Sequence, residues 1–164
     1  MLVLAFPVTL YFLGIPNSGF SDDRIKKMVG DDPTLGPVNL SDVPKKEGVV
    51  VTRFSDLNDA AYDQGKREGL QGQTAVLEGL FKRLGDREFT LFRMKMTCCA
   101  ADTVPLKVRI VTPTALTGFK DMDWVEVKGQ VHFLQVPNSN QYVPVIKVAD
   151  VTDIKKVDKK NVYE

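Results

Sequence analysis

Apolar and polar residues alternate with a period of two along much of the second half of this chain. The alternation is clearest over residues 88–96 and 106–111, where one side of each segment is apolar and the other is polar or charged. Successive side chains of a strand point to opposite faces, so both segments are predicted to be β-strands with one buried face. Residues 74–81 and 123–134, and a segment within 142–154, complete five predicted strands.

Two of the five predicted strands carry a glycine in their interior, Gly79 and Gly129. A glycine inside a strand is typical of a bulge or a sharp bend. Together with a turn over residues 84–87 and a long loop over residues 113–122, these bends favour a small coiled barrel. The predicted fold class is mainly β (small α+β), a five-stranded OB-like barrel, and an open β-sandwich fragment is the competing architecture.

One helix is predicted just before the barrel, over residues 56–68. Ser55 is the candidate N-cap of this helix, because a serine hydroxyl can accept a hydrogen bond from a backbone N–H of the first turn. Leu57, Ala60 and Ala61 share one face at helical spacing. We therefore expect this helix to pack on the barrel.

The composition changes along the chain and divides it into four predicted parts. The first is apolar, the second is polar and interrupted by prolines with a short helix near residues 24–29, the third contains the barrel and opens with a strand at residues 49–51, and the last is rich in lysine. Their predicted bounds are 1–20 for the apolar segment, 21–48 for the linker, 49–155 for the barrel domain and 156–164 for a charged, solvated tail.

The apolar segment is uncharged from Met1 to Ile15. It is shorter than the roughly 20 residues that a membrane-spanning helix needs, and Pro7 lies near its middle. It also lacks the cationic start of a signal peptide, since the first basic residue is Arg24. Three interpretations stay open: the end of a transmembrane helix that starts upstream, an atypical signal or anchor, and a buried element of a soluble fold.

Charge is balanced over the whole chain, with 22 Lys and Arg against 21 Asp and Glu. A protein that tracks a phosphate backbone normally carries a strongly basic surface, so no nucleic-acid partner is expected. The chain has a single histidine and neither a P-loop nor a dinucleotide-binding glycine motif. We therefore do not predict an enzyme, although a cysteine nucleophile remains a hypothesis.

The most distinctive chemical feature is the adjacent pair Cys98 and Cys99, followed by Asp102. A disulfide between neighbouring residues would be strained, because their Cα atoms lie about 3.8 Å apart. Thiolates suit copper(I), zinc or trivalent arsenic, and Asp102 is a candidate third ligand. The simpler alternatives are that the cysteines only pack and that Asp102 caps a turn, so the expected cofactor is a soft metal ion or none.

Three further residues form a candidate binding surface: Arg93, Trp124 and His132. Arg93 could pair with Asp102. Trp124 could stack on an extended ligand together with other aromatic residues of the barrel, as in OB-folds that bind single strands. His132 is predicted to face solvent, because its neighbours in the strand are apolar. A metal-ligand role for His132 is the alternative.

Two segments also resemble a known family. The pattern Arg93-x-x-x-x-Cys98-Cys99-x-Ala101-Asp102-x-x-Pro105, followed by residues 123–129 (DWVEVKG), is similar to the core of the YcgQ-like permease-subunit proteins. The resemblance covers about residues 49–164. It implies transmembrane helices at the N-terminus, then a linker and a β-rich soluble domain.

The resemblance further implies a partner, a multi-pass membrane permease related to metal or metalloid exporters. The expected function is that of a membrane-tethered accessory subunit of a transporter, whose soluble domain docks the partner and binds a metal or metalloid through thiols. The expected location is the cell membrane, with the soluble domain outside the cytoplasm. An OB-type binding module for an oligonucleotide or another extended ligand is the alternative.

Overall fold

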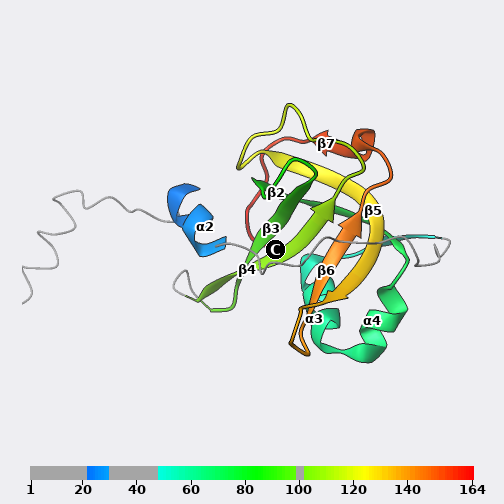
Figure 1. Ribbon diagram of the computed structural model, residues 1–164. Coiled ribbons are helices and arrows are strands. Elements are labelled where there is room, and N and C mark those ends of the chain that lie inside the picture. The colour runs from blue at the N-terminus through cyan, green and yellow to red at the C-terminus, as the bar shows by residue number, and fades with distance from the viewer. Residues whose placement is uncertain (1–21, 30–47, 99–101) are drawn as a thin grey trace, which may run out of the picture.

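The computed structural model describes residues 22–29, 48–98 and 102–164 (Figure 1). The apolar segment, most of the linker and Cys99 lie outside these residues. In chain order the elements are α2 (Asp22–Val29), β1 (Val49–Val51), α3 (Phe54–Tyr62), α4 (Gln64–Leu70), β2 (Thr74–Arg83), β3 (Glu88–Met96), β4 (Thr103–Val111), β5 (Trp124–Gln135), β6 (Tyr142–Lys147), the 3₁₀ turn η1 (Val151–Asp153) and β7 (Ile154–Lys156).

Five strands close into a barrel in the order β2-β3-β4-β6-β5, and β5 returns to pair with β2. The β4–β6 pair is parallel and the other four pairs are antiparallel. β1 adds to β2 in parallel, and β7 adds to β5 antiparallel. This closed five-stranded arrangement has the strand order of an OB-fold, so the predicted fold class is confirmed and the open sandwich is wrong.

The barrel closes because β2 and β5 each bend and pair with different strands along their length. β5 pairs with β2 over residues 124–130 and with β6 over residues 130–135. Gly129 lies at this change of partner, and a Cβ there would stand 2.7 Å from the Lys147 carbonyl oxygen. In β2, a Cβ on Gly79 would stand 2.8 Å from the Phe92 carbonyl oxygen. Both glycines therefore permit a close approach of two backbones, as expected for bends in a small barrel.

The predicted helix before the barrel is two helices. α3 ends at Tyr62 and α4 begins at Gln64, so the continuous helix expected over residues 56–68 is wrong. Asp63 between them is extended, and its side chain accepts a hydrogen bond from the Lys66 N–H, which caps α4. Ser55 is likewise not the N-cap: Arg53 takes that position and Ser55 lies in the first turn.

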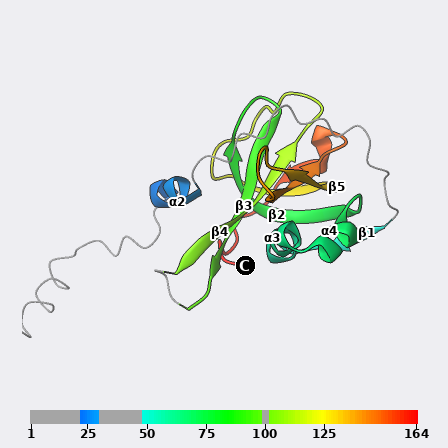
Figure 2. The same cartoon turned by 60° about the horizontal axis from the view of Figure 1, so that its bottom comes forward.

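Helix α3 lies against the barrel (Figure 2) and supplies part of the main hydrophobic core. Phe54, Leu57 and Ala60 are buried against apolar side chains that point into the barrel. Leu57 and Ala60 are fully buried, which confirms the apolar face expected for this helix. The remaining barrel residues of this core include Leu77, Phe81, Phe89, Leu91, Val108, Ile110, Val125, Val127, Val131, Phe133 and Ile146.

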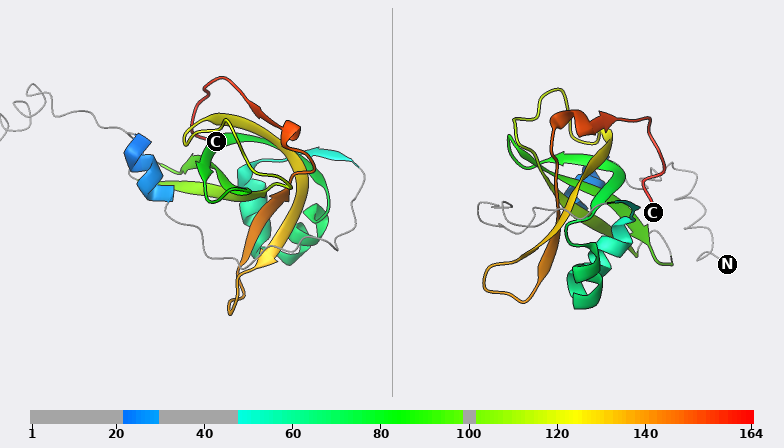
Figure 3. Two further views of the ribbon diagram at one scale, coloured as in Figure 1. Left: turned by 45° about the horizontal axis from the view of Figure 1, so that its top comes forward. Right: turned by 90° about the vertical axis from the view of Figure 1, so that its right-hand side faces the viewer.

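A second, smaller cluster lies on the outer face of the barrel. Ile25 and Val29 of α2 are buried there with Leu80, Phe92 and Trp124, and Met94 completes the buried group. The helix predicted near residues 24–29 is thus present as α2, and it lies against the outer face of the barrel (Figure 3, left). No helix within the described residues is long and apolar enough to cross a membrane.

Candidate functional site

The hairpin of β3 and β4 carries the predicted cysteine site near its tip, which projects from the barrel (Figure 2). Cys98 is exposed, and its Sγ lies 3.6 Å from Oδ2 of Asp102. The Thr97 N–H donates to the Asp102 carbonyl oxygen at 3.3 Å and closes this turn. The structure therefore brings Cys98 and Asp102 together, while Cys99 lies outside the described residues. Within the described part of the chain, no group of three His, Cys, Asp or Glu side chains could hold a metal ion.

Arg93 has a different setting from the one expected. Its Nη2 donates to the carbonyl oxygens of Asn161 and Tyr163, each at 2.7 Å, and its guanidinium carbon lies 5.6 Å from the ring centroid of Trp124. The structure thus brings together two of the predicted binding residues, Arg93 and Trp124. Both residues contact the C-terminal segment and each other.

His132 is buried, so the prediction that it faces solvent is wrong. Only 1% of the residue is exposed, and neither ring nitrogen has a hydrogen-bond partner among the described residues. Burial, and after it the positive charge of Lys147, lowers the pKa of His132 below its usual 6.5. The neutral imidazole is therefore the favoured form at pH 7.

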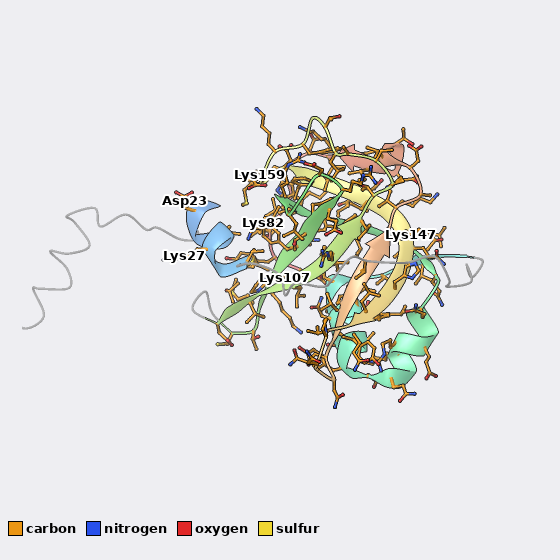
Figure 4. All side chains as sticks on the ribbon, in the orientation of Figure 1. Asp23, Lys27, Lys82, Lys107, Lys147 and Lys159 are labelled. Carbon is orange, nitrogen blue, oxygen red and sulfur yellow. The ribbon has the colours of Figure 1, made fainter. Side chains whose placement is uncertain are left out.

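The aromatic residues of the barrel mostly fill its two clusters. Phe89 and Phe92 are fully buried, Trp124 is 6% exposed, and the rings of Phe81 and Phe89 stack with their centroids 4.5 Å apart. Charged side chains are spread over different sides of the molecule, as the labelled lysines show in Figure 4. Arg109 pairs with Glu88 on the outer face. A row of exposed aromatic rings within a cationic groove, the usual platform for single-stranded nucleic acid, is not found in the described residues.

The last residues, predicted to be a solvated tail, also have a structural role that the sequence does not predict. Lys155, Lys156, Lys159 and Lys160 are exposed, as that prediction required. The backbone around them, however, is docked: the Val157 N–H donates to the Trp124 carbonyl oxygen, and Lys160 pairs with Glu78. The apolar residues Val157, Val162 and Tyr163 within this charged segment were the available signal, and all three pack against the outer cluster.

A cavity of about 350 Å³ lies between α2, the barrel and this C-terminal segment. Apolar side chains form most of its wall, and two lysines and an asparagine come from the C-terminal segment. Its lining residues are Ile25, Leu80, Met122, Trp124, Lys159, Lys160, Asn161 and Val162.

The strand order and the closed barrel place the protein in the class of small OB-like β domains. The sequence profile described as the DUF1980 C-terminal domain matches residues 67–164. The chain belongs to this family, which is consistent with the resemblance to YcgQ-like proteins.

No curated protein matches the chain in sequence. Among solved structures, a DUF3299 family protein from Pseudomonas aeruginosa PAO1 is similar, with 14% sequence identity and a TM-score of 0.39. The match covers 76% of this chain and 93% of that one.

Proposed function

We propose that this protein is a membrane-tethered accessory subunit whose OB-like barrel docks a multi-pass membrane permease. The observation that carries the proposal is the packing of α2 on the barrel through Ile25 and Val29. The apolar segment that would enter a membrane ends within a few residues of α2. If that segment is anchored, α2 holds the outer face of the barrel close to the membrane surface, where a permease partner lies.

A binding role also agrees with the chemistry of the barrel surface. The projecting β3–β4 hairpin exposes Met96 on one face and Val104 on the other near its tip, where the thiol of Cys98 is also exposed. A projecting hairpin that exposes apolar side chains on both faces can bury them when it binds another protein, and burial of apolar surface favours such association. The functional proposal therefore places partner docking on this side of the molecule.

The first test asks whether the chain is held in a membrane and on which side. The full chain is expected in the membrane fraction after alkaline carbonate washing, and deletion of residues 2–15 is expected to release it. In intact cells, a membrane-impermeant maleimide should label Cys98, because its side chain is exposed. A Cys98→Ser, Cys99→Ser variant is the labelling control. Recovery of the full chain in the soluble fraction would contradict the tether, and labelling only after permeabilisation would contradict an extracytoplasmic domain.

The second test concerns the permease. A tagged full chain, solubilised in mild detergent, should co-purify with a multi-pass membrane protein, and a variant with Met96→Ser and Val104→Ser should lose that protein. Both substituted residues are exposed, so the variant should fold normally. Lys128→Ser, an exposed change on β5, is the matched control. Absence of any multi-pass protein from the wild-type preparation would contradict the accessory role.

We include thiol-based capture of a soft metal or metalloid ion in the proposal, because the exposed Cys98 lies beside Asp102 and is followed by a second cysteine in the sequence. Titration with zinc, copper(I) and arsenite is expected to give binding that is lost in Cys98→Ser and in Cys99→Ser and weakened in Asp102→Asn. Unchanged binding in all three variants would remove the thiols from the proposed function.

A further inference from the structure

The C-terminal segment continues the sheet at the point where β2 leaves the edge of β3. The register of β2 with β3 ends at the Leu80–Phe92 pair. Two residues further along β3, the Met94 N–H donates to the Val162 carbonyl oxygen at 2.9 Å, and the Met94 carbonyl accepts from the Glu164 N–H at 2.9 Å. Met94 and Tyr163 thereby form a parallel bridge. The segment is bound as an added strand is, through backbone groups that any sequence could supply.

Side chains of the barrel domain hold the same segment as well: Glu78 pairs with Lys160, and two further contacts lie closer to the β3 edge. The Arg93 guanidinium donates to two backbone carbonyls of the segment, those of Asn161 and Tyr163. The Glu164 carboxylate lies at the start of α3, where it accepts hydrogen bonds from the N–H groups of Phe54 and Ser55 at 3.0 and 3.1 Å and from the Ser55 hydroxyl at 2.7 Å. A carboxylate is favoured at a helix N-terminus because the first N–H groups are unpaired and the helix dipole is positive there.

Little of the segment itself is buried. Residues 158–161 and Glu164 are exposed, and Val157, Val162 and Tyr163 are only partly buried. The surface beneath them is different, because Phe92 and Met94 are fully buried. The segment thus covers a formed apolar surface but is held mainly by backbone hydrogen bonds and by charged groups. Such a segment can be replaced by another that offers the same groups.

We infer that the edge of β3, Arg93 and the N-terminus of α3 form a peptide-binding groove, which the chain's own residues 157–164 occupy. The groove fits an extended segment of the partner that carries a glutamate directly after an aromatic residue, as Tyr163 and Glu164 do here. That a permease supplies this segment rests on the proposed function. The existence of a displaceable peptide site does not.

The test uses the full chain in mild detergent, with a protease site inserted between Lys156 and Val157. Trp124 is the only tryptophan of the chain, and it lines the cavity beside Asn161 and Val162, so its fluorescence reports whether the groove is occupied. After cleavage and dilution the segment is expected to leave and the emission to change, while the far-ultraviolet circular dichroism stays constant. A synthetic peptide of residues 157–164 should then restore the original emission.

Two peptides with the same chemical change separate recognition of the carboxylate from a general effect of charge. A Glu164→Gln peptide should bind at least about tenfold more weakly, because it loses the charge-assisted hydrogen bonds at α3. An Asp158→Asn peptide should bind within about twofold of the wild-type peptide, since Asp158 is exposed. Uncleaved chain should not respond to micromolar peptide, because a tethered segment has an effective concentration on the order of millimolar.

Each other outcome overturns the inference. Loss of the circular dichroism signal on release would make residues 157–164 a structural strand of the domain. A cleaved segment that excess peptide cannot exchange, or equal affinities for the two altered peptides, would remove the proposed recognition. Light scattering decides the identity of the occupant: a dimer formed by exchange of tails would show that a second copy of this chain, and not a foreign segment, fills the groove. All of these readouts are independent of membrane attachment and of permease co-purification.

Discussion

Replacement of Gly129 by alanine tests how the barrel closes. A Cβ at this position would stand 2.5 Å from Cγ2 of Ile146 and 2.7 Å from the Lys147 carbonyl oxygen. Carbon atoms in favourable contact lie about 3.5–4.0 Å apart, so the Ile146 side chain would have to move by about 1 Å. Ile146 is fully buried and the Lys147 carbonyl belongs to β6, so neither neighbour can yield without disturbing the sheet.

Overpacking of this kind typically costs about 1–3 kcal/mol, and we expect Gly129→Ala to fall in the upper part of that range, because one of the two clashes is with backbone. Urea unfolding followed by Trp124 fluorescence measures the change in the free energy of unfolding. A loss of 2 kcal/mol corresponds to a fall in Tm of roughly 4–8 °C for a chain of this size.

Gly69→Ala is the matched control, because it makes the same chemical change in helix α4, where a new Cβ meets nothing within 4 Å. It should leave the protein as stable or raise the free energy of unfolding by up to about 1 kcal/mol. Both substitutions restrict the unfolded chain equally, so the difference between their free energies of unfolding reports on the folded state, where only Gly129→Ala makes a clash. If Gly129→Ala proves as stable as Gly69→Ala, the argument that the close approach requires glycine is refuted.

Three other predictions follow from burial and charge. The pKa of His132 is lowered in the folded state, so acidification through about pH 6.5 should reduce the free energy of unfolding by at most about 1.4 kcal/mol per pH unit. In urea unfolding at pH 5–7, His132→Phe should flatten this pH dependence. An unchanged slope would assign the pH dependence to other groups. Leu57→Ala should lower the free energy of unfolding by about 2–5 kcal/mol in the same urea experiment, since Leu57 is fully buried under the barrel. A loss below about 1 kcal/mol would show that α3 is dispensable to the core. Cys98→Ser should change stability by less than about 0.5 kcal/mol, because the side chain is exposed; thermal unfolding checks this, and a large loss would indicate a packing role.

The barrel could be predicted because its strands carry their own local signals. The alternation of residues 88–96 gave the bounds of β3 correctly, and the interior glycines of β2 and β5 indicated the bends that close the sheet. The break at Asp63 was not predictable from the apolar spacing, because Leu57, Ala60 and Ala61 all precede it and no later residue continues their face. Asp63 ends one helix and caps the next through its side chain, and the spacing of apolar residues carries no information about such a local hydrogen bond.

His132 shows why strand alternation can assign the wrong environment. It does point away from the main core, as the pattern predicts, but the outer face is itself buried at this place: Val145, its cross-strand partner on β6, is 0% exposed. Alternation distinguishes the two faces of a strand, while solvent exposure depends on what covers each face.

The groove on β3 could not be predicted from the sequence for another reason. The Glu164 carboxylate and the Ser55 hydroxyl are 109 positions apart, and Arg93 recognises backbone carbonyls that carry no sequence signature. Cys98 and Asp102, by contrast, are close in the chain and close in space, so their proximity could be expected from the turn alone.

The hydrogen bonds between Glu164 and the first turn of α3 also bring Glu164 to within a few chain positions of Gly48, where the described barrel domain starts. Chains with adjacent ends generally tolerate circular permutation, in which the old ends are joined and new ones are opened in an exposed loop. A glycine linker from Glu164 to Gly48, long enough to run back along residues 48–54, with new ends in the turn over residues 138–140, should therefore give a permuted barrel with the same fold. In such a permutant α2 and everything before it can be left out or attached elsewhere, so the barrel becomes separable from its tether by rearrangement of the chain alone.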